Sequence, residues 1–235
     1  MSKYLSKTWV VCLLACVSCF LWGSAFPGVK IGYEWFQIAS EASAAQIVFA
    51  GCRFFLAGIM VIFFGSLSSG RFLRPEGIQW KHAAVISLFQ TILQYILFYI
   101  GLAHTAGTKA SIIVGANVFI AILTASLIFR QEKLTGEKIL GCLVGFAGVV
   151  LINMTPGGIS MHVSFMGEGL VLLSTVAYAF SSVIMKDYSK TDHPVMLSGY
   201  QFFIGGIVMI AVGTAMGGSI RIPSVKAFGI LAYLA

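Results

Sequence analysis

Charged residues are scarce in this chain: Asp, Glu, Lys and Arg make up 10% of its 235 residues, whereas 58% are hydrophobic. A typical soluble domain is about 25% charged and about 45–50% apolar. A soluble fold of this length could not hide so much apolar surface, because more than half of any folded protein's surface stays exposed. The composition excludes an ordinary soluble domain and predicts an all-α, polytopic helical membrane protein surrounded by the lipid bilayer.

The sequence also lacks the patterns of common enzymes and metal sites. There is no H-E-x-x-H, G-x-S-x-G or P-loop motif, and no pair of acids lies within one apolar segment. The five cysteines fall inside apolar segments without Cys/His metal spacing, and the four histidines are scattered over loops and segment ends. All eight acids lie in loops or at segment ends, so no buried carboxylate for proton transfer is visible. We expect no enzyme activity, no catalytic residue, no cofactor and no metal.

Long apolar segments dominate what is present. A membrane-spanning helix needs about 20 mostly apolar residues, and the first segment is too long for a cleaved signal peptide. Eight crossings are predicted, the last of them cut by the end of the chain. They cover residues 9–31, 44–65, 83–103, 110–129, 139–154, 169–186 and 196–216, and a segment that starts near residue 225.

The basic residues alternate between the two sides of this topology. Ten of the fifteen Lys and Arg residues fall on one side: Lys3, Lys7, Arg71, Arg74, Lys81, Arg130, Lys133, Lys138, Lys186 and Lys190. Cytoplasmic loops carry such an excess, so the N-terminus is predicted to be cytoplasmic in a multi-pass protein of the plasma (inner) membrane. The formal net charge of +7 does not indicate a nucleic-acid partner, because the basic residues form no single patch.

An internal repeat links the two parts of the sequence. Residues 53–59 (RFFLAGI) match residues 201–207 (QFFIGGI), and Trp22 precedes Lys30 as Tyr178 precedes Lys186. The second and seventh segments therefore correspond, which gives a repeat unit of five helices. An odd number of helices forces the second unit into the opposite orientation, an inverted repeat of the kind that secondary transporters use. We predict one unit over residues 1–154 and a second, truncated unit over residues 167–235.

Several spaced motifs resemble one family. They are Trp22-Gly23-Ser24 with Lys30, the turn from Gly101 to Ala110, and Glu132 to Thr135 followed by Gly145-Phe146-Ala147-Gly148. In this order they resemble the EamA-like branch of the drug/metabolite transporter superfamily. The resemblance implies ten helices in two inverted halves that move small organic metabolites, often outward, by alternating access. The alternative, because three helices of the second half are missing, is a truncated, non-transporting membrane subunit or gene fragment.

Arg53 is the most informative polar residue. It lies about 13 Å along the second segment at 1.5 Å per residue, too deep to reach the membrane surface easily. A buried guanidinium needs carbonyls, a carboxylate, water or an anionic substrate, so Arg53 either binds substrate or ties helices together. The resemblance places an arginine here too.

Other polar residues are further candidates for substrate binding. Gln90 and Gln94 lie one turn apart in the third segment, and Asn117 takes the place where the family commonly has proline. Each either contacts a polar solute or hydrogen-bonds a neighbouring helix. Tyr95 and Tyr99 are interpreted as packing residues.

The repeat adds three candidates and one packing motif. Trp22 and Tyr178 could stack on an organic solute or pack in the core, and Gln201, the counterpart of Arg53, could be its polar partner. The G-x-x-x-G of Gly141 and Gly145 predicts tight helix packing or a homodimer contact.

Overall fold

The computed structural model describes residues 8–39, 42–130, 133–153, 164–220 and 224–235, and this part of the chain is helical without strands. The expected all-α class is confirmed. Three short segments are π-helical and the rest of the regular structure is α-helical. In chain order the elements are α2 (Thr8–Trp35), α3 (Ser43–Ser69), α4 (Gln79–Ile86), η1 (Ser87–Leu93), α5 (Gln94–Leu102), α6 (Gly107–Gly115), α7 (Asn117–Leu123), η2 (Thr124–Ile128), α8 (Gly136–Asn153), η3 (Phe165–Gly169), α9 (Leu170–Tyr188), α10 (Pro194–Ala215) and α11 (Val225–Leu234).

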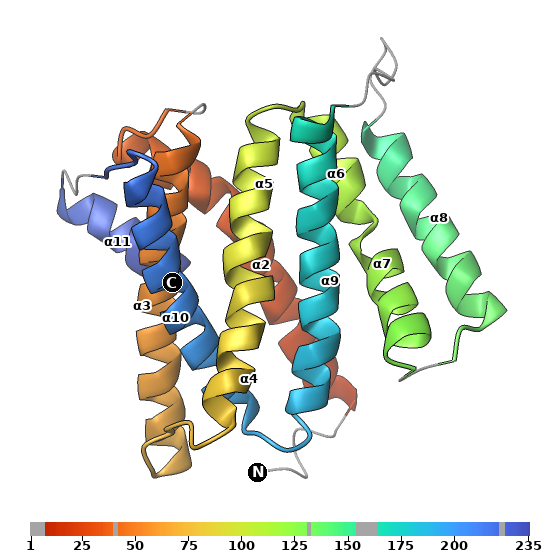
Figure 1. Ribbon diagram of the computed structural model, residues 1–235, viewed down its shortest axis with the longest axis horizontal. Helices are drawn as coiled ribbons and strands as arrows, with labels where there is room; N and C mark the ends of the chain where they lie inside the picture. Colours follow the sequence, from red (N-terminus) through yellow and green to blue (C-terminus); the bar gives the residue numbers. More distant parts are fainter. Residues whose placement is uncertain (1–7, 40–41, 131–132, 154–163, 221–223) are drawn as a thin grey trace.

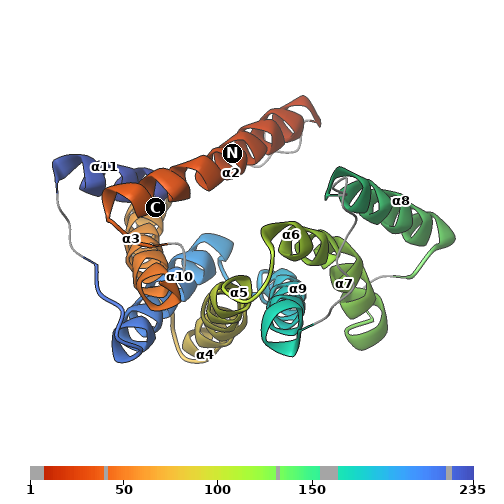
Figure 2. The same ribbon diagram turned by 90° about the horizontal axis from the view of Figure 1, so that it is seen from above.

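The helices stand side by side in a curved row. Figures 1 and 2 show α10 with α3 at one end of the row, then α4 and α5, then α9, then α6 and α7, with α8 outermost. Helix α2 crosses on the other side and packs beside α11 (Figure 2). Helix α9, from the second predicted unit, therefore lies between helices of the first predicted unit, so the two parts of the sequence are interleaved.

Five helical stretches of the described chain are long and apolar enough to cross a membrane. They are Ser43–Ser69, Gln79–Leu102, Lys109–Ile128, Phe165–Tyr188 and Pro194–Ala215. These stretches match the second, third, fourth, sixth and seventh predicted crossings, so the chain is a polytopic membrane protein. Shorter apolar stretches, Thr8–Leu21 and Val225–Leu234, fall on the first and last predicted crossings. The full number of eight stays a prediction.

The central feature of the fold is a close contact between α3 and α10, the repeat-related helices. A Cβ atom on Gly58 would lie 2.5 Å from the Phe203 backbone nitrogen, and one on Gly206 would lie 2.4 Å from that of Phe55. Gly206 and Phe203 follow Gly58 and Phe55 by the same 148 positions, so the two helices exchange equivalent contacts. The Phe55 and Phe203 rings also meet, at 5.1 Å between centroids. We call this contact the glycine seam.

The glycine pair on α8 behaves differently. No atom beyond the helix's own backbone lies within 4 Å of a Cβ atom built on Gly141 or Gly145. Tight packing of this motif within the described chain is therefore not observed. The homodimer contact stays a prediction.

Basic residues gather at one end of the row, which we call the basic end. The connections after α3, η2 and α9, which include Arg71, Arg130 and Lys190, all lie at this end, the lower one in Figure 1. The Lys109 end of α6 lies at the opposite, far end (Figure 1). The alternation expected from the sequence is thus present in space, and the cytoplasmic location of the basic end stays a prediction.

Candidate functional site

Arg53 is half-buried and lies against aromatic residues of the bundle. Its guanidinium carbon is 4.7 Å from the centre of the Phe54 ring, and its charge acts on the Tyr95 hydroxyl. The Phe54 and Tyr95 rings meet edge to face at 4.6 Å. Within the described residues no carboxylate forms an ion pair with Arg53. The guanidinium therefore lies against one aromatic face, without an ion pair in the described chain, and is able to attract an anion.

Other phenol groups act electrostatically on this part of the bundle. The Tyr178 hydroxyl on α9 acts on Tyr95, and both the Arg53 charge and the Tyr99 hydroxyl act on the buried Tyr33 hydroxyl of α2. Arg53 and Tyr178 are thus both electrostatic neighbours of Tyr95.

The predicted amides carry unused hydrogen-bond acceptors. The side-chain oxygens of Gln90, Gln94 and Asn117 are buried and have no hydrogen-bond partner among the described residues. A buried acceptor without a partner costs about 1–3 kcal/mol, so each of these oxygens needs a donor, which a water or another bound molecule can supply. Gln94 precedes Tyr95 in α5, which connects these acceptors to the Arg53 cluster along the chain.

The backbone near these amides is irregular. Gln90 lies within the π-helical segment η1, and Asn117 begins α7 directly after the break that ends α6 at Gly115. π-helical turns and broken helices occur often at functional sites, because they leave backbone groups and side chains free from the regular ladder. The sequence predicted continuous helices here. The helix breaks beside Asn117, the residue that stands where the family commonly has proline, so no proline causes the break.

Gln201, the repeat counterpart of Arg53, has another partner. Its buried side-chain oxygen accepts a hydrogen bond of 3.0 Å from the Thr91 hydroxyl of η1. Gln201 therefore ties α10 to the π-helical segment in this structure. Trp22 lies in α2, but its side chain is outside the described residues.

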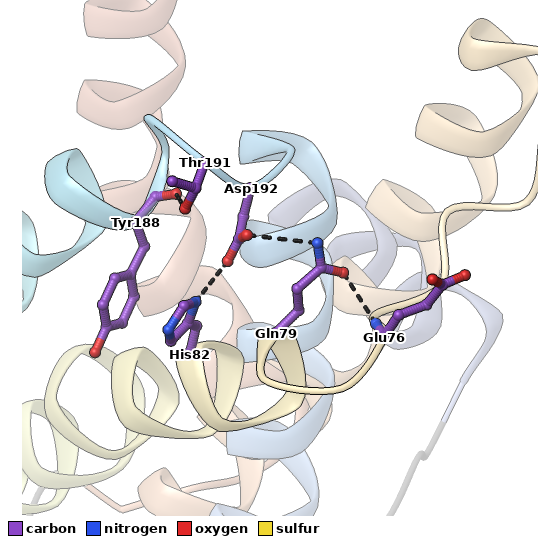
Figure 3. A network of polar contacts seen from close by, with 6 residues as sticks. All are labelled: Glu76, Gln79, His82, Tyr188, Thr191 and Asp192. Atoms are coloured by element: carbon purple, nitrogen blue, oxygen red, sulfur yellow. Dashed lines mark hydrogen bonds and ion pairs between the residues drawn. The ribbon is translucent and has the colours of Figure 1, made fainter.

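A polar network at the basic end was missed by the sequence reasoning, which assigned no role to the histidines. The His82 ring nitrogen Nδ1 lies 2.6 Å from the buried carboxylate of Asp192, and the His82 ring stacks on Tyr188 at 3.8 Å. Gln79 donates a weaker bond of 3.4 Å to the same carboxylate. Figure 3 shows these groups joining α4 to the connection between α9 and α10. The sequence indicated only that the connection before α4 and the connection between α9 and α10 lie on the same side of the membrane.

A second network joins the two repeats at the far end. Glu168 accepts bonds of 2.8 Å from the Lys109 ammonium, the Thr105 hydroxyl and the Ser164 backbone. Lys109 and Thr105 belong to the first predicted unit and Glu168 to the second. Among the described residues, no three His, Cys, Asp or Glu side chains gather as metal ligands would.

These features define a class: a polytopic helical membrane protein that carries an arginine and several unpaired amide oxygens on its apolar helices. Residues 9–154 and 165–235 match the EamA-like transporter family. The chain belongs to this family, which agrees with the resemblance seen in the sequence.

Curated relatives carry transporter names. The chain is 25% identical to an uncharacterized transporter of Archaeoglobus fulgidus over 86% of this chain and 65% of the relative. It is 27% identical to the uncharacterized transporter YvbV of Bacillus subtilis over 90% of this chain and 65% of the relative. It is also 27% identical to a WAT1-related chloroplastic protein of Arabidopsis thaliana, over 82% of this chain and 45% of that protein. The chain spans about two-thirds of the length of the first two, and no solved structure matches it significantly.

Proposed function

We propose that this protein is a secondary carrier that moves a small organic metabolite out of the cell across the cytoplasmic membrane by alternating access. Arg53 and its surroundings form the substrate site. The observation that carries this proposal is a guanidinium inside the bundle, without an ion-pair partner among the described residues, in a helix next to the one that bears Gln94. A substrate with an acidic group and hydrogen-bond donors complements this set of groups.

Inverted repeats fit the rocking that alternating access requires. The glycine seam joins the repeat-related helices α3 and α10 near their middles, while the polar networks of Asp192 and Glu168 join the units at opposite ends. Polar contacts that can separate at both ends support alternating access, because each end has to open in turn. The other candidates from the sequence, Gln90, Asn117, Trp22, Tyr178 and Gln201, are proposed as further substrate contacts.

The test compares two variants of Arg53 in cells that export metabolites into their medium. Arg53→Lys keeps the charge but loses the planar fork that grips two acceptors at once, whereas Arg53→Gln introduces the residue that the repeat has at position 201. Both should lose transport while the amount of folded protein in the membrane stays near that of the unmodified chain. Arg130→Gln, which changes an exposed arginine at the basic end, is the matched control.

The quantity measured is the accumulation of metabolites in the medium per folded molecule, compared with cells that lack the protein. An unchanged value in both Arg53 variants would remove Arg53 from the site. Cells with the unmodified chain whose medium matches that of cells without it would contradict the carrier function itself.

A further inference from the structure

A cavity of about 630 Å³ opens at the basic end, away from the Arg53 cluster. Its walls come from two connections, the one between α3 and α4 and the one between α9 and α10. Arg71, Arg74, Lys190 and His193 line it, together with the acids Glu76 and Asp192. The cavity therefore lies at the end of two apolar helices, α3 and α10, where a membrane's headgroups would surround it.

The charges in this cavity are unevenly satisfied. Asp192 is held by His82 and Gln79, and Lys190 is paired with Asp187 at 2.8 Å. Arg71 and Arg74 have no ion pair with a carboxylate in the described part of the chain. Two exposed guanidinium groups thus line the cavity without an ion pair, near the Glu76 carboxylate.

Apolar side chains flank these arginines. Phe72 is 69% exposed, Ile78 59% and Trp80 42%, although all three belong to a connection or its adjoining helix turn. Trp80 packs edge to face on Tyr200 at 5.1 Å, and Arg74 is the charged neighbour of the Tyr200 hydroxyl. Tryptophan and tyrosine beside basic residues are typical of the membrane–water interface. A small water-soluble anion would not contact the exposed Phe72 and Ile78 side chains, whereas a lipid would cover them.

We infer that this cavity binds the headgroup phosphate of an anionic phospholipid through Arg71 and Arg74, with the lipid's apolar part against Phe72 and Trp80. Guanidinium groups bind phosphate oxygens with two parallel hydrogen bonds. Basic pockets between membrane helices bind anionic headgroups in this way. The site is separate from the proposed substrate site, so it stands whether or not the chain transports a metabolite.

The test measures lipid binding to the purified chain in a neutral detergent by native mass spectrometry and by the shift of the unfolding temperature. Phosphatidylglycerol is the probe, phosphatidylcholine the neutral lipid, and inorganic phosphate the free anion. We expect phosphatidylglycerol to bind and to raise the unfolding temperature, and the other two to do neither. The double variant Arg71→Gln/Arg74→Gln should bind phosphatidylglycerol at least about tenfold more weakly.

The control variant Arg130→Gln/Lys133→Gln removes two positive charges from another connection at the same end and should bind as the unmodified chain does. If the double Gln variant folds poorly, Arg71→Lys/Arg74→Lys replaces it, and a weaker but measurable preference for phosphatidylglycerol is expected. Equal binding of both lipids, or equal loss in the control variant, would overturn the inference. Competition by inorganic phosphate at millimolar concentration would assign the cavity to a free anion instead and overturn it too.

Discussion

The glycine seam gives the most direct stability prediction, through the substitution Gly206→Ala. The new Cβ atom would lie 2.4 Å from the Phe55 nitrogen, 2.7 Å from the Phe55 Cα atom and 2.8 Å from the Gly51 oxygen. All three obstacles are backbone atoms, which cannot rotate away as a side chain would. Helices α3 and α10 must therefore separate by about 1 Å to restore ordinary contact distances, which weakens the dispersion attraction along the seam.

The expected cost follows from two opposing effects. Overpacking of a tight contact costs about 1–3 kcal/mol, and a backbone obstacle favours the upper end of that range. Alanine is favoured over glycine within a helix by about 0.5–1 kcal/mol. We therefore expect Gly206→Ala to lower the free energy of unfolding by about 2 kcal/mol. Gly58→Ala should do the same, because its Cβ atom would lie 2.5 Å from the Phe203 nitrogen.

The control is Gly145→Ala on α8, where no atom beyond the helix's own backbone lies within 4 Å of the new Cβ atom. That variant should be as stable as the unmodified chain, or more stable by up to about 1 kcal/mol. Unfolding is measured in mixed micelles with increasing denaturing detergent, followed by circular dichroism. The reasoning is refuted if Gly206→Ala and Gly145→Ala unfold at the same detergent fraction.

Three further outcomes are expected. Asp192→Asn weakens the buried contact with His82 and should lower the free energy of unfolding by about 1–3 kcal/mol. Asp187→Asn, which changes an exposed pair with Lys190, should alter it by less than about 1 kcal/mol. Equal effects of the two substitutions in micelle unfolding would contradict this. Thr91→Val leaves the Gln201 oxygen buried without its donor and should cost about 1–3 kcal/mol in the same assay, a loss that an unchanged unfolding midpoint would disprove. The third outcome concerns orientation, in a chain whose natural cysteines have been replaced. Ser69→Cys should resist an impermeant thiol reagent in intact cells and Ala106→Cys should react, because the basic end is predicted to be cytoplasmic. The opposite labelling would reverse the orientation.

The architecture could be predicted from sequence because it depends on long-range averages. Apolar length located α3, α9 and α10, and the alternation of basic residues anticipated the gathering of Arg71 and Lys190 at one end. These signals are summed over many residues, so no single contact had to be known. The match of residues 53–59 to 201–207 also pointed to the two helices that form the glycine seam.

Individual partners could not be predicted, because they depend on contacts between distant segments. The sequence suggested Gln201 as a partner for Arg53, which stays a prediction, but gave no sign of the hydrogen bond that Thr91 donates to Gln201. The π-helical segment η1 changes which side of the third crossing each residue faces, and hydrophobic periodicity carries no sign of it. His82 was dismissed because its partner lies 110 positions further along the chain.

The networks of Asp192 and Glu168 lie at opposite ends of the row, so each faces a different aqueous compartment once the protein sits in a membrane (Figure 1). An agent that cannot cross the bilayer can therefore reach only one of them from a given side. An impermeant carboxylate reagent would therefore modify Asp192 only from one side of the membrane and Glu168 only from the other. The same protein would then respond differently to identical treatments applied from inside and from outside.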